Sequence, residues 1–335
     1  GYKWQSSLTD KIYAPSEIPS YKADTYELVE LPKDYLLMKG TDFRSKIKDN
    51  IETYLFNRIV FTDETAPADE SITIVDVSLN NNGSVVAWEN WGTLYVSSQK
   101  SGQQIIAHED CSYMFSGICD ALTEIDFSYW LDTSKVKNMS HLLDSTFIGD
   151  RLNIEGTEYL NLYNLEDVSY MFSGIYDGYG GTNIYLDLSN WYTPNLKNMS
   201  YMFSYAFPNA SSITINMSGW NTSNVTNMSN MFAISTYYAS SITLTGLGTW
   251  STNNVTNMRS MFNISADSLQ SLSITGINRW NTSKVRDMSY MFYIYPGYTL
   301  SSVDIPDISG WDVSSVTSYS GFNSGVENYI TAPNF

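Results

Sequence analysis

One pattern of apolar and polar positions recurs along most of the chain at an interval of about 30 residues. Its clearest copy covers residues 220–232, WNTSNVTNMSNMF, in which the apolar side chains are Trp220, Val225, Met228, Met231 and Phe232. Copies of varying strength begin, at steps of 29 to 31 residues, at Trp130, Leu160, Trp191, Trp220, Trp250, Trp280 and Trp311. Such a period is typical of a solenoid, in which each unit buries its apolar face only against its neighbours.

Each copy divides into a strand, a corner and a run of closely spaced apolar residues. Residues 213–215 alternate aliphatic and polar side chains, as a strand with one buried face does, and Met217, three residues before the Trp, is a further inward position. From Val225 to Phe232 the apolar spacing is three, three and one, which predicts one or two helical turns. We therefore expect an α/β repeat solenoid over residues 111–323, with a parallel sheet on one side and short helices on the other.

The first 110 residues lack the full repeat. Residues 1–41 contain scattered Pro and charged residues and predict an irregular arm with short extended pieces. Residues 42–56 carry apolar side chains three and four apart, which predicts a short amphipathic helix. Residues 58–61 resemble a strand, and short β runs between Gly- and Asn-containing turns predict an antiparallel meander over 72–107. These elements would form an N-terminal cap over 42–110, because the first coil of a solenoid otherwise exposes an open edge.

The whole motif, a strand followed by Trp-x-Thr-Ser-x-Val-x-Asn-Met-Ser-x-Met-Phe, resembles the BspA-type leucine-rich repeats of bacterial surface proteins. Residues 59–67 and 83–88 also resemble the lead-in that such proteins carry. The resemblance covers residues 58–323 and leaves a C-terminal tail at 324–335. It implies a right-handed, curved leucine-rich-repeat-like solenoid, a secreted or cell-surface location, and binding rather than catalysis.

The net charge of the chain limits the kinds of molecule that it is expected to bind. Eighteen basic residues stand against 35 acidic ones, a net charge of −17, which repels phosphate backbones and anionic lipid headgroups. We therefore expect no nucleic-acid partner, and no segment is apolar over the length of a membrane span. Ser, Thr, Asn and 26 Tyr make up much of the polar surface, which favours an extracellular protein. The chain begins at Gly1 with no leader, so we expect a trimmed or mature fragment, and a monomer.

Few residues offer chemistry. Residues 108–111, His-Glu-Asp-Cys, have the residue types of a metal site, but neighbours on a strand point to opposite faces. The other His, His141, lies inside a repeat, so no Ser-His-acid arrangement can be argued. The two cysteines, Cys111 and Cys119, could pair locally, although two buried free thiols are the simpler interpretation. We expect no cofactor and no bound metal.

A pair of carboxylates would suffice for a glycosidase. The acidic residues on or beside outward strand positions are Glu124, Asp126, Glu155, Asp187 and Asp304. No close pair is evident from the sequence, so a solvated acidic face is the preferred interpretation, with calcium binding as a weaker alternative. The Asn residues of the repeat, including Asn138, Asn198, Asn224, Asn227, Asn254 and Asn263, are expected to satisfy backbone groups at turns rather than to carry glycans.

We therefore expect a non-enzymatic surface module that binds a protein or glycan macromolecule on another cell or matrix; the alternative is a carbohydrate-binding or polysaccharide-degrading protein. Two surfaces compete for the ligand. The outward strand positions are small and hydroxylated, whereas the loops after each Phe are rich in Tyr, which is common in binding surfaces. Those rings would align as an edge stripe, or else pack as a ladder that shields the core. The predicted ligand contacts are Tyr237, Tyr238, Tyr293, Tyr295 and, on the sheet face beside Asp187, Tyr185.

Overall fold

The computed structural model describes residues 2–6, 12–13, 26–30, 34–178, 181–297 and 299–335. Its strands are β1 Tyr2–Ser6, β2 Ile12–Tyr13, β3 Tyr26–Glu30, β4 Arg58–Thr62, β5 Ile74–Asp76, β6 Val86–Asn90, β7 Thr93–Ser97, β8 Ile105–Ile106, β9 Leu122–Asp126, β10 Leu131–Asp132, β11 Ile148–Glu155, β12 Asn183–Asp187, β13 Ser212–Asn216, β14 Ser235–Thr236, β15 Ser241–Thr245, β16 Ile264–Ala266, β17 Ser271–Ile274, β18 Ile294–Tyr295 and β19 Ser302–Asp304. The helices are α1 Gly40–Asn50 and the single 3₁₀ turns η2 Thr53–Leu55, η3 Thr157–Tyr159, η4 Leu247–Thr249 and η5 Ile277–Arg279.

The described parts of the predicted arm form a small antiparallel sheet of order β2-β1-β3. The rest of residues 1–33 lies outside the described residues. Residues 34–38 then enter the cap, because Leu36 bridges Ile106 and Leu37 bridges Ser78. The arm predicted over 1–41 therefore contains regular strands and reaches into the cap at its end.

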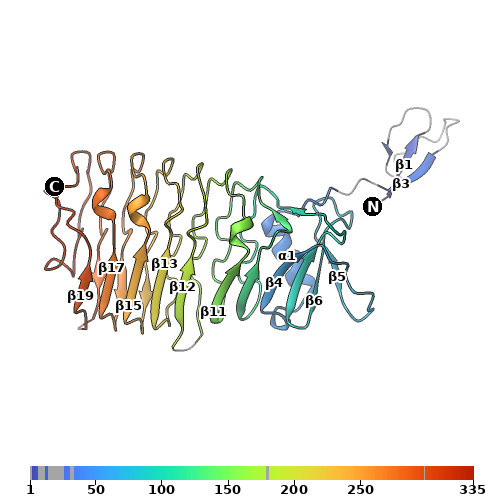
Figure 1. Ribbon diagram of the computed structural model, residues 1–335, viewed down its shortest axis with the longest axis horizontal. Helices are drawn as coiled ribbons and strands as arrows, with labels where there is room; N and C mark the ends of the chain where they lie inside the picture. The colour runs from blue at the N-terminus through green and yellow to red at the C-terminus, as the bar shows by residue number, and fades with distance from the viewer. Residues whose placement is uncertain (1, 7–11, 14–25, 31–33, 179–180, 298) are drawn as a thin grey trace.

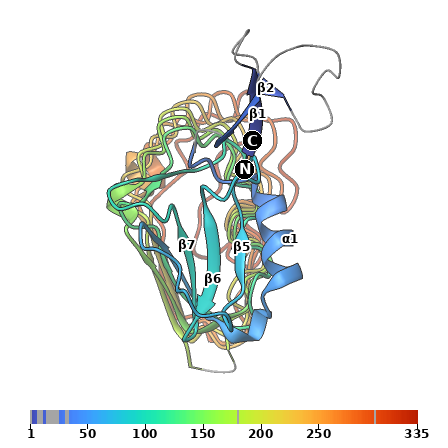
Figure 2. The ribbon, with the colours of Figure 1, turned by 90° about the vertical axis from the view of Figure 1, so that its right-hand side faces the viewer.

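The cap is built on a six-stranded mixed sheet of order β11-β9-β4-β7-β6-β5. Strands β5, β6 and β7 are antiparallel neighbours, as the meander prediction requires. On its other side β7 pairs in parallel with β4, and β4 pairs in parallel with β9. Strand β8 was assigned to the meander wrongly, because it pairs in parallel with β10. Helix α1 lies beside β5, as Figure 2 shows, and buries Phe43 and Ile47.

The helix predicted over 42–56 is shorter than its apolar pattern. It ends at Asn50, and Ile51 is extended. Tyr54 and Leu55, which the pattern placed on the buried face, are exposed on the turn η2. The run of three- and four-residue spacings continues past the helix end by coincidence, because the turn carries those two side chains away from the core.

From residue 110 onward the chain forms a β-solenoid of about seven parallel turns (Figure 1). One side is the five-stranded parallel sheet β12-β13-β15-β17-β19, whose central strands pair residue by residue, Ile213 with Ile242 and Ile242 with Leu272. In β13 and β15 the aliphatic positions are buried and the Ser, Thr and Asn positions partly exposed. The predicted inward residue three before each Trp is buried too, as at Met217 and Leu247.

Two further parallel ladders join the coils. One consists of single bridges between equivalent residues, running Asp110, Asn138, Asp167, Asn198, Asn227, Asn257, Asp287 and Ser318. The other is the short sheet β14-β16-β18. Several Asn predicted to act at turns do so, because the side chains of Asn138, Asn198 and Asn227 accept the backbone N–H of the Ser two residues later, at 2.8 to 3.1 Å.

The helical turns expected between Val225 and Phe232, and in the equivalent runs, are replaced by tight turns. The equivalent run of the preceding coil shows why. There the N–H groups of Met199, Tyr201 and Phe203 donate to backbone carbonyls of residues 227–231 in the following coil, at 3.0, 2.9 and 2.8 Å. Tyr201 has a φ of 59°, which a right-handed helix does not contain. Alternate N–H groups therefore bond between coils rather than along the chain, and the described Val-to-Phe runs contain no helix. The single 3₁₀ turns η3, η4 and η5 lie elsewhere, directly before the corner residues Leu160, Trp250 and Trp280.

Stacked aromatic rings fill the core of the solenoid. Phe172, Phe203, Phe232, Phe262 and Phe292 form a continuous column with ring centroids 5.1 to 5.6 Å apart. Corner Trp rings also stack, with centroids 5.6 Å apart for Trp191 and Trp220 and 6.1 Å apart for Trp280 and each of its neighbours Trp250 and Trp311. Burial of these large rings in every coil is the main source of stability expected for such a stack.

The sheet is interrupted between β11 and β12. Strand β11 ends the six-stranded sheet and β12 begins the five-stranded one. The register of β11 shifts between Ile148 and Asn153, and its coil carries Leu160 in place of the corner Trp. The coil that lacks the corner Trp is thus the coil whose strand pairs with the preceding strand β9 but not with the following strand β12.

The C-terminal tail packs onto the last coil. Val326 and Ile330 are buried, and the ring of Phe335 stacks on Tyr319 with 4.4 Å between centroids. Residues 324–335 therefore cover the apolar end of the solenoid.

Candidate functional site

One side of the solenoid carries two columns of polar side chains, which flank a buried Val or Leu in each coil. In each coil, the residue of the first column lies three positions before the residue that forms the single bridge to the next coil, and the residue of the second column lies one position before it. The first column is Lys135, Asn164, Asn195, Asn224, Asn254 and Lys284, and the second is Glu109, Lys137, Glu166, Lys197, Thr226, Thr256 and Arg286. Between them the side chains of Val136, Leu165, Leu196, Val225, Val255 and Val285 are fully buried. We call these two columns the amide–lysine face.

The asparagines of this face are held in one orientation by the preceding coil. The side-chain N–H groups of Asn164, Asn195 and Asn224 donate to backbone carbonyls 30 to 32 residues upstream, each at 2.7 Å. Asn254 does the same at 2.8 Å, and its Oδ1 accepts a hydrogen bond from Lys284 at 2.8 Å. Because the nitrogen is used internally, the amides of Asn164, Asn195 and Asn224 keep the oxygen as an acceptor for a ligand, whereas the oxygen of Asn254 already binds Lys284. This is the structural role predicted for Asn224 and Asn254.

The face is cationic although the chain is strongly acidic. Its two columns contain five Lys or Arg residues and two Glu residues. Lys137 pairs with Glu109 at 2.8 Å and Lys197 with Glu166 at 2.7 Å. The hydrogen bond from Lys137 lowers the pKa of Glu109, and the same contact raises the pKa of Lys137. Lys284 and Arg286 lie in one coil near the C-terminal end, and neither column has a carboxylate in that coil.

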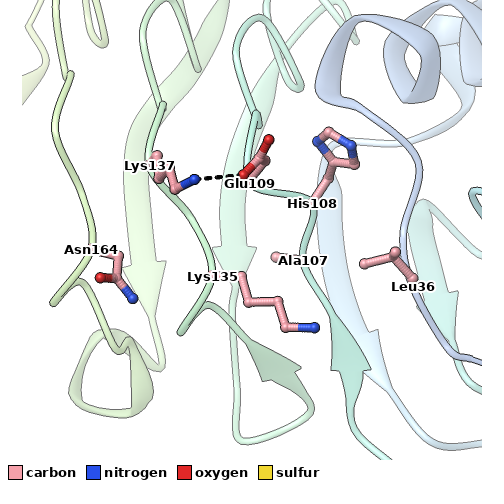
Figure 3. Close-up of a pocket in the computed structure, with 7 residues that line it drawn as sticks. All are labelled: Leu36, Ala107, His108, Glu109, Lys135, Lys137 and Asn164. Carbon is pink, nitrogen blue, oxygen red and sulfur yellow. Dashed lines mark hydrogen bonds and ion pairs between the residues drawn. The ribbon is translucent and has the colours of Figure 1, made fainter.

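Two shallow hollows lie along the face. The first, of about 410 Å³, is where the cap meets the first coils; Figure 3 shows the Glu109–Lys137 pair at its rim and Lys135 and Asn164 across it. The second, of about 620 Å³, extends over four coils between Lys197 and Lys284. Amide oxygens, hydroxyls and ammonium groups line the second hollow. The hydroxyls of Thr226 and Thr256 and the ammonium groups of Lys197 and Lys284 each donate one hydrogen bond within the protein. The remaining ammonium N–H groups and oxygen lone pairs can bond to an extended polar ligand.

Residues 108–111 do not converge on a common point. The backbone N–H of Asp110 donates to His108 Nδ1 at 3.0 Å, Glu109 pairs with Lys137, and Asp110 pairs with Lys39 at 3.1 Å. The thiol of Cys111 is directed to the carbonyl of His108. Within the part of the chain that the structure describes, no three His, Cys, Asp or Glu side chains are grouped as metal ligands. Cys111 and Cys119 are free and buried, which raises the pKa of each thiol to about 12.

Three of the five candidate carboxylates come together on the sheet of the cap. Asp126 is in register with Glu155 on β11, and Glu124 on the same strand as Asp126 pairs with Arg58. Burial raises the pKa of Asp126, and the nearby Glu155 and Glu124 raise it further. The sequence indicated no such pair, since it could not fix the register of β11. Asp187 and Asp304 lie on other strands, where Asp187 accepts a hydrogen bond from Asn216 and Asp304 from Ser273.

The predicted tyrosine contacts are all exposed but do not form a single stripe. The rings of Tyr237 and Tyr238 pack edge to face with their centroids 6.3 Å apart, and the rings of Tyr293 and Tyr290 do so with their centroids 5.8 Å apart. Tyr295 on β18 is in register with Ser265 of the preceding coil, so no ring continues its column there. Tyr185 lies apart, in a hollow of about 280 Å³ at the interruption between β11 and β12, with Arg151 and Asn153 across it.

A genuine aromatic column lies at a position that the sequence analysis did not select. Tyr113, His141, Tyr170 and Tyr201 stack with their rings nearly parallel and their centroids 4.3, 4.5 and 4.6 Å apart. All four have positive φ values between 56° and 59°, and His141 Nδ1 lies 2.7 Å from Asp144. The recurrence of Ser-Tyr-Met-Phe in the repeats was the signal that could have revealed it.

Comparison with known families supports the repeat architecture. The chain belongs to the family described as "Mycoplasma protein of unknown function, DUF285", which matches residues 109–244 and 234–331. No curated protein and no solved structure matches the chain. None of the helices in the described residues has the length and apolar character needed to cross a membrane.

Proposed function

We propose that this protein is a non-catalytic binding module that recognises an extended macromolecule, a protein or a glycan, along its amide–lysine face. The observation that carries the proposal is the repetition of one orientated amide over four successive coils, at Asn164, Asn195, Asn224 and Asn254, with Lys or Arg in the coils on either side of these four. A polymer with polar groups along its length would meet an amide at each of these four coils, and its anionic groups could pair with the cations at the two ends. Many such contacts can add up to useful affinity even though no single hollow is deep.

We further propose that the module acts outside the cell, as a variant of the BspA-type leucine-rich repeat. The support is the repeated Trp-to-Phe motif and a surface solvated mainly by Ser, Thr, Asn and Tyr. Protease treatment of intact cells, followed by detection of the chain, tests this location. Degradation without lysis is expected, whereas full protection of the chain in intact cells would contradict it.

The exposed tyrosines are the competing surface for the ligand. An array of neutral and acidic glycans and extracellular matrix proteins should be probed with the wild type and two variants. The first variant replaces Lys197, Lys284 and Arg286 with Gln, and the second replaces Tyr237, Tyr238, Tyr293 and Tyr295 with Ser. We expect a ligand whose affinity falls about tenfold or more in the first variant. Loss of affinity in the second variant alone would assign the site to the tyrosine loops, and an array without any ligand would contradict the proposal.

A carbohydrate-processing activity is the alternative, and the pairing of Asp126 with Glu155 is the observation that favours it. A carboxyl with a raised pKa next to a second carboxylate is the arrangement used by glycoside hydrolases. A panel of polysaccharide substrates distinguishes the two functions. Turnover that is abolished by Asp126→Asn would replace the binding proposal, whereas our proposal predicts no turnover.

A further inference from the structure

The tip of the β6–β7 hairpin presents a tryptophan to solvent in a disfavoured backbone conformation. Asn90 pairs with Thr93, so the turn consists of Trp91 and Gly92, and their φ values are 50° and 82°. Two positive φ values are typical of a type I′ turn, which prefers Asn followed by Gly. Trp91 is nevertheless 95% exposed, whereas Trp88 in the same hairpin is buried and stacks on Tyr95. Asn at position 91 would therefore suit this turn better than Trp does.

Other exposed apolar side chains surround a groove beside this turn. The groove has a volume of about 470 Å³ and is lined by Tyr54 and Leu55 of η2, by residues 50–52, by residues 71–73, and by Glu89 and Asn90. Ile74 and Trp91, both exposed, directly follow lining residues. The N–H groups of Asn57 and Arg58 donate to the carbonyl of Gly92 at 3.0 and 3.3 Å, which fixes the turn next to η2. Four exposed large apolar side chains, those of Tyr54, Leu55, Ile74 and Trp91, thus line or directly adjoin a groove whose other lining residues are mostly polar. Exposed apolar groups gathered at a polar-rimmed groove mark an interaction surface.

The charged residues at the groove indicate that a partner would be positively charged. Glu52 and Glu89 belong to the lining, and the ten lining residues include no Lys or Arg. Asp69 and Glu70 immediately precede the lining residues 71–73. Glu89 also accepts the N–H of Gly92 at 2.9 Å, so one of its oxygens is held by the turn. Anionic lipid headgroups would be repelled here, whereas Lys or Arg side chains would be attracted.

We propose that the groove between η2, β5 and the Trp91 turn binds a basic segment of another protein that carries aliphatic or aromatic side chains. The apolar side chains of the segment pack against Trp91, Tyr54 and Leu55, and its Lys or Arg side chains pair with Glu52 and Glu89. Exposed Trp residues of this kind frequently carry much of the binding energy of an interface. None of these residues belongs to the amide–lysine face, so this second surface stands or falls separately from the proposed function.

The substitution Trp91→Asn separates a binding role from a structural one. Asn suits the first position of the turn, so the variant should melt at the same temperature as the wild type or higher. Tyr205→Asn is the matched control, because Tyr205 is also exposed and has a φ of 55°. A melting temperature that falls in Trp91→Asn would show that the indole stabilises the fold, and would overturn the proposal.

The probes are three synthetic peptides of equal length, alternating Lys with Leu, Lys with Ser, and Glu with Leu. Fluorine NMR of fluorotryptophan-labelled protein identifies the Trp91 signal as the one missing from Trp91→Asn. The Lys–Leu peptide should shift that signal, bind Trp91→Asn at least about tenfold more weakly and Glu52→Gln more weakly, and bind Tyr205→Asn as it binds the wild type. The other two peptides should leave the signal in place.

Besides a lower melting temperature of Trp91→Asn, four results would overturn the proposal. The first is binding of the Lys–Leu peptide to Trp91→Asn as tightly as to the wild type. The second is binding of the Lys–Ser peptide as tightly as the Lys–Leu peptide, which would indicate attraction by charge alone. The third is binding to phosphatidylcholine vesicles that depends on Trp91 when no peptide binds, which would assign the patch to a lipid surface. The fourth is a wild-type dimer in sedimentation that Trp91→Asn converts to a monomer, which would assign it to a second copy of this chain.

Discussion

The indole Nε1 of Trp220 donates a 3.0 Å hydrogen bond to the backbone carbonyl of Leu188 in the preceding coil. Trp250, Trp280 and Trp311 make the same bond to the residue three before the previous Trp, at 3.0 to 3.2 Å. Trp191 would need the carbonyl of Thr157, on the far side of the interrupted sheet, and among the described residues its buried Nε1 has no partner. The corner Trp thus packs in the core and, from Trp220 onward, also links its coil to the preceding coil by a hydrogen bond.

This difference predicts unequal effects of the same substitution. Trp220→Phe and Trp191→Phe remove similar volume from stacked, buried rings, but only the first removes a hydrogen bond. We expect Trp220→Phe to lower the free energy of unfolding by about 1 kcal/mol more than Trp191→Phe. Urea denaturation of the two variants measures the difference. Equal losses, or a larger loss at Trp191, would contradict the role of the Nε1 bond.

The phenylalanine column should be the most sensitive part of the core. Phe262 is fully buried, with Phe232 at 5.6 Å on one side and Phe292 at 5.2 Å on the other. Phe262→Ala should cost about 3 to 5 kcal/mol, because it removes a buried ring and leaves a cavity. Tyr237→Ala, at an exposed ring, is the control and should change stability by less than about 0.5 kcal/mol. An unchanged melting temperature for Phe262→Ala would contradict the continuous core.

Asp177 should make the protein less stable as the pH rises. It is 4% exposed, its Oδ1 accepts the N–H of Asn209 at 2.9 Å, and among the described residues its Oδ2 has no partner. Burial raises the pKa of Asp177 above its ordinary value of 3.8. The native state therefore holds this proton more tightly than the unfolded state, and the group loses stabilising effect as the pH rises through that window.

Asp177→Asn tests this sign. The amide keeps an oxygen for Asn209 and carries no charge, so the variant should be more stable than the wild type at pH 7 and nearly equal to it below the ordinary pKa. Urea midpoints of both proteins across the acidic range provide the measurement. A variant less stable than the wild type at pH 7 would refute the prediction.

Both thiols should be inert in the native protein. Since burial raises their pKa to about 12, only about one molecule in ten thousand carries a thiolate at pH 8. Iodoacetamide should therefore modify neither Cys111 nor Cys119 until the protein is unfolded in urea, when both should react. Rapid alkylation of the native protein, detected by mass spectrometry, would contradict this prediction and show that the start of the solenoid opens readily.

The sequence predicted the strands well and the turns poorly. The strand over 213–215 and the inward Met217 were predictable because a period of two and a fixed distance to Trp220 are local signals. The run from Met228 to Phe232 fits both a helix and a tight turn, since spacing alone does not say whether an N–H bonds within its coil or to the next. The N–H of Phe203 donates to the carbonyl of Met231 in the next coil at 2.8 Å, which shows that the equivalent run is a tight turn and not a helix.

The candidate surfaces depended on register. Asn224 and Asn254 were recognised as structural residues, but their alignment with Lys284 follows only from the bridges between coils. Similarly, the hairpin turn at residues 89–92 was predicted, yet an apolar Trp91 within it gave no sign of being exposed. The predicted Tyr237 and Tyr295 are exposed, and whether they contact a ligand stays a prediction.

The most direct test of the account is to map the lysines that a ligand protects. The polymer retained from the array should be bound to the wild-type protein, and the acetylation rate of each Lys compared with that of the free protein by mass spectrometry. Our account predicts slower acetylation of Lys197 and Lys284 on the amide–lysine face, with Lys46 on α1 unchanged as the internal control. Unchanged rates at Lys197 and Lys284 in a fully bound sample would contradict it.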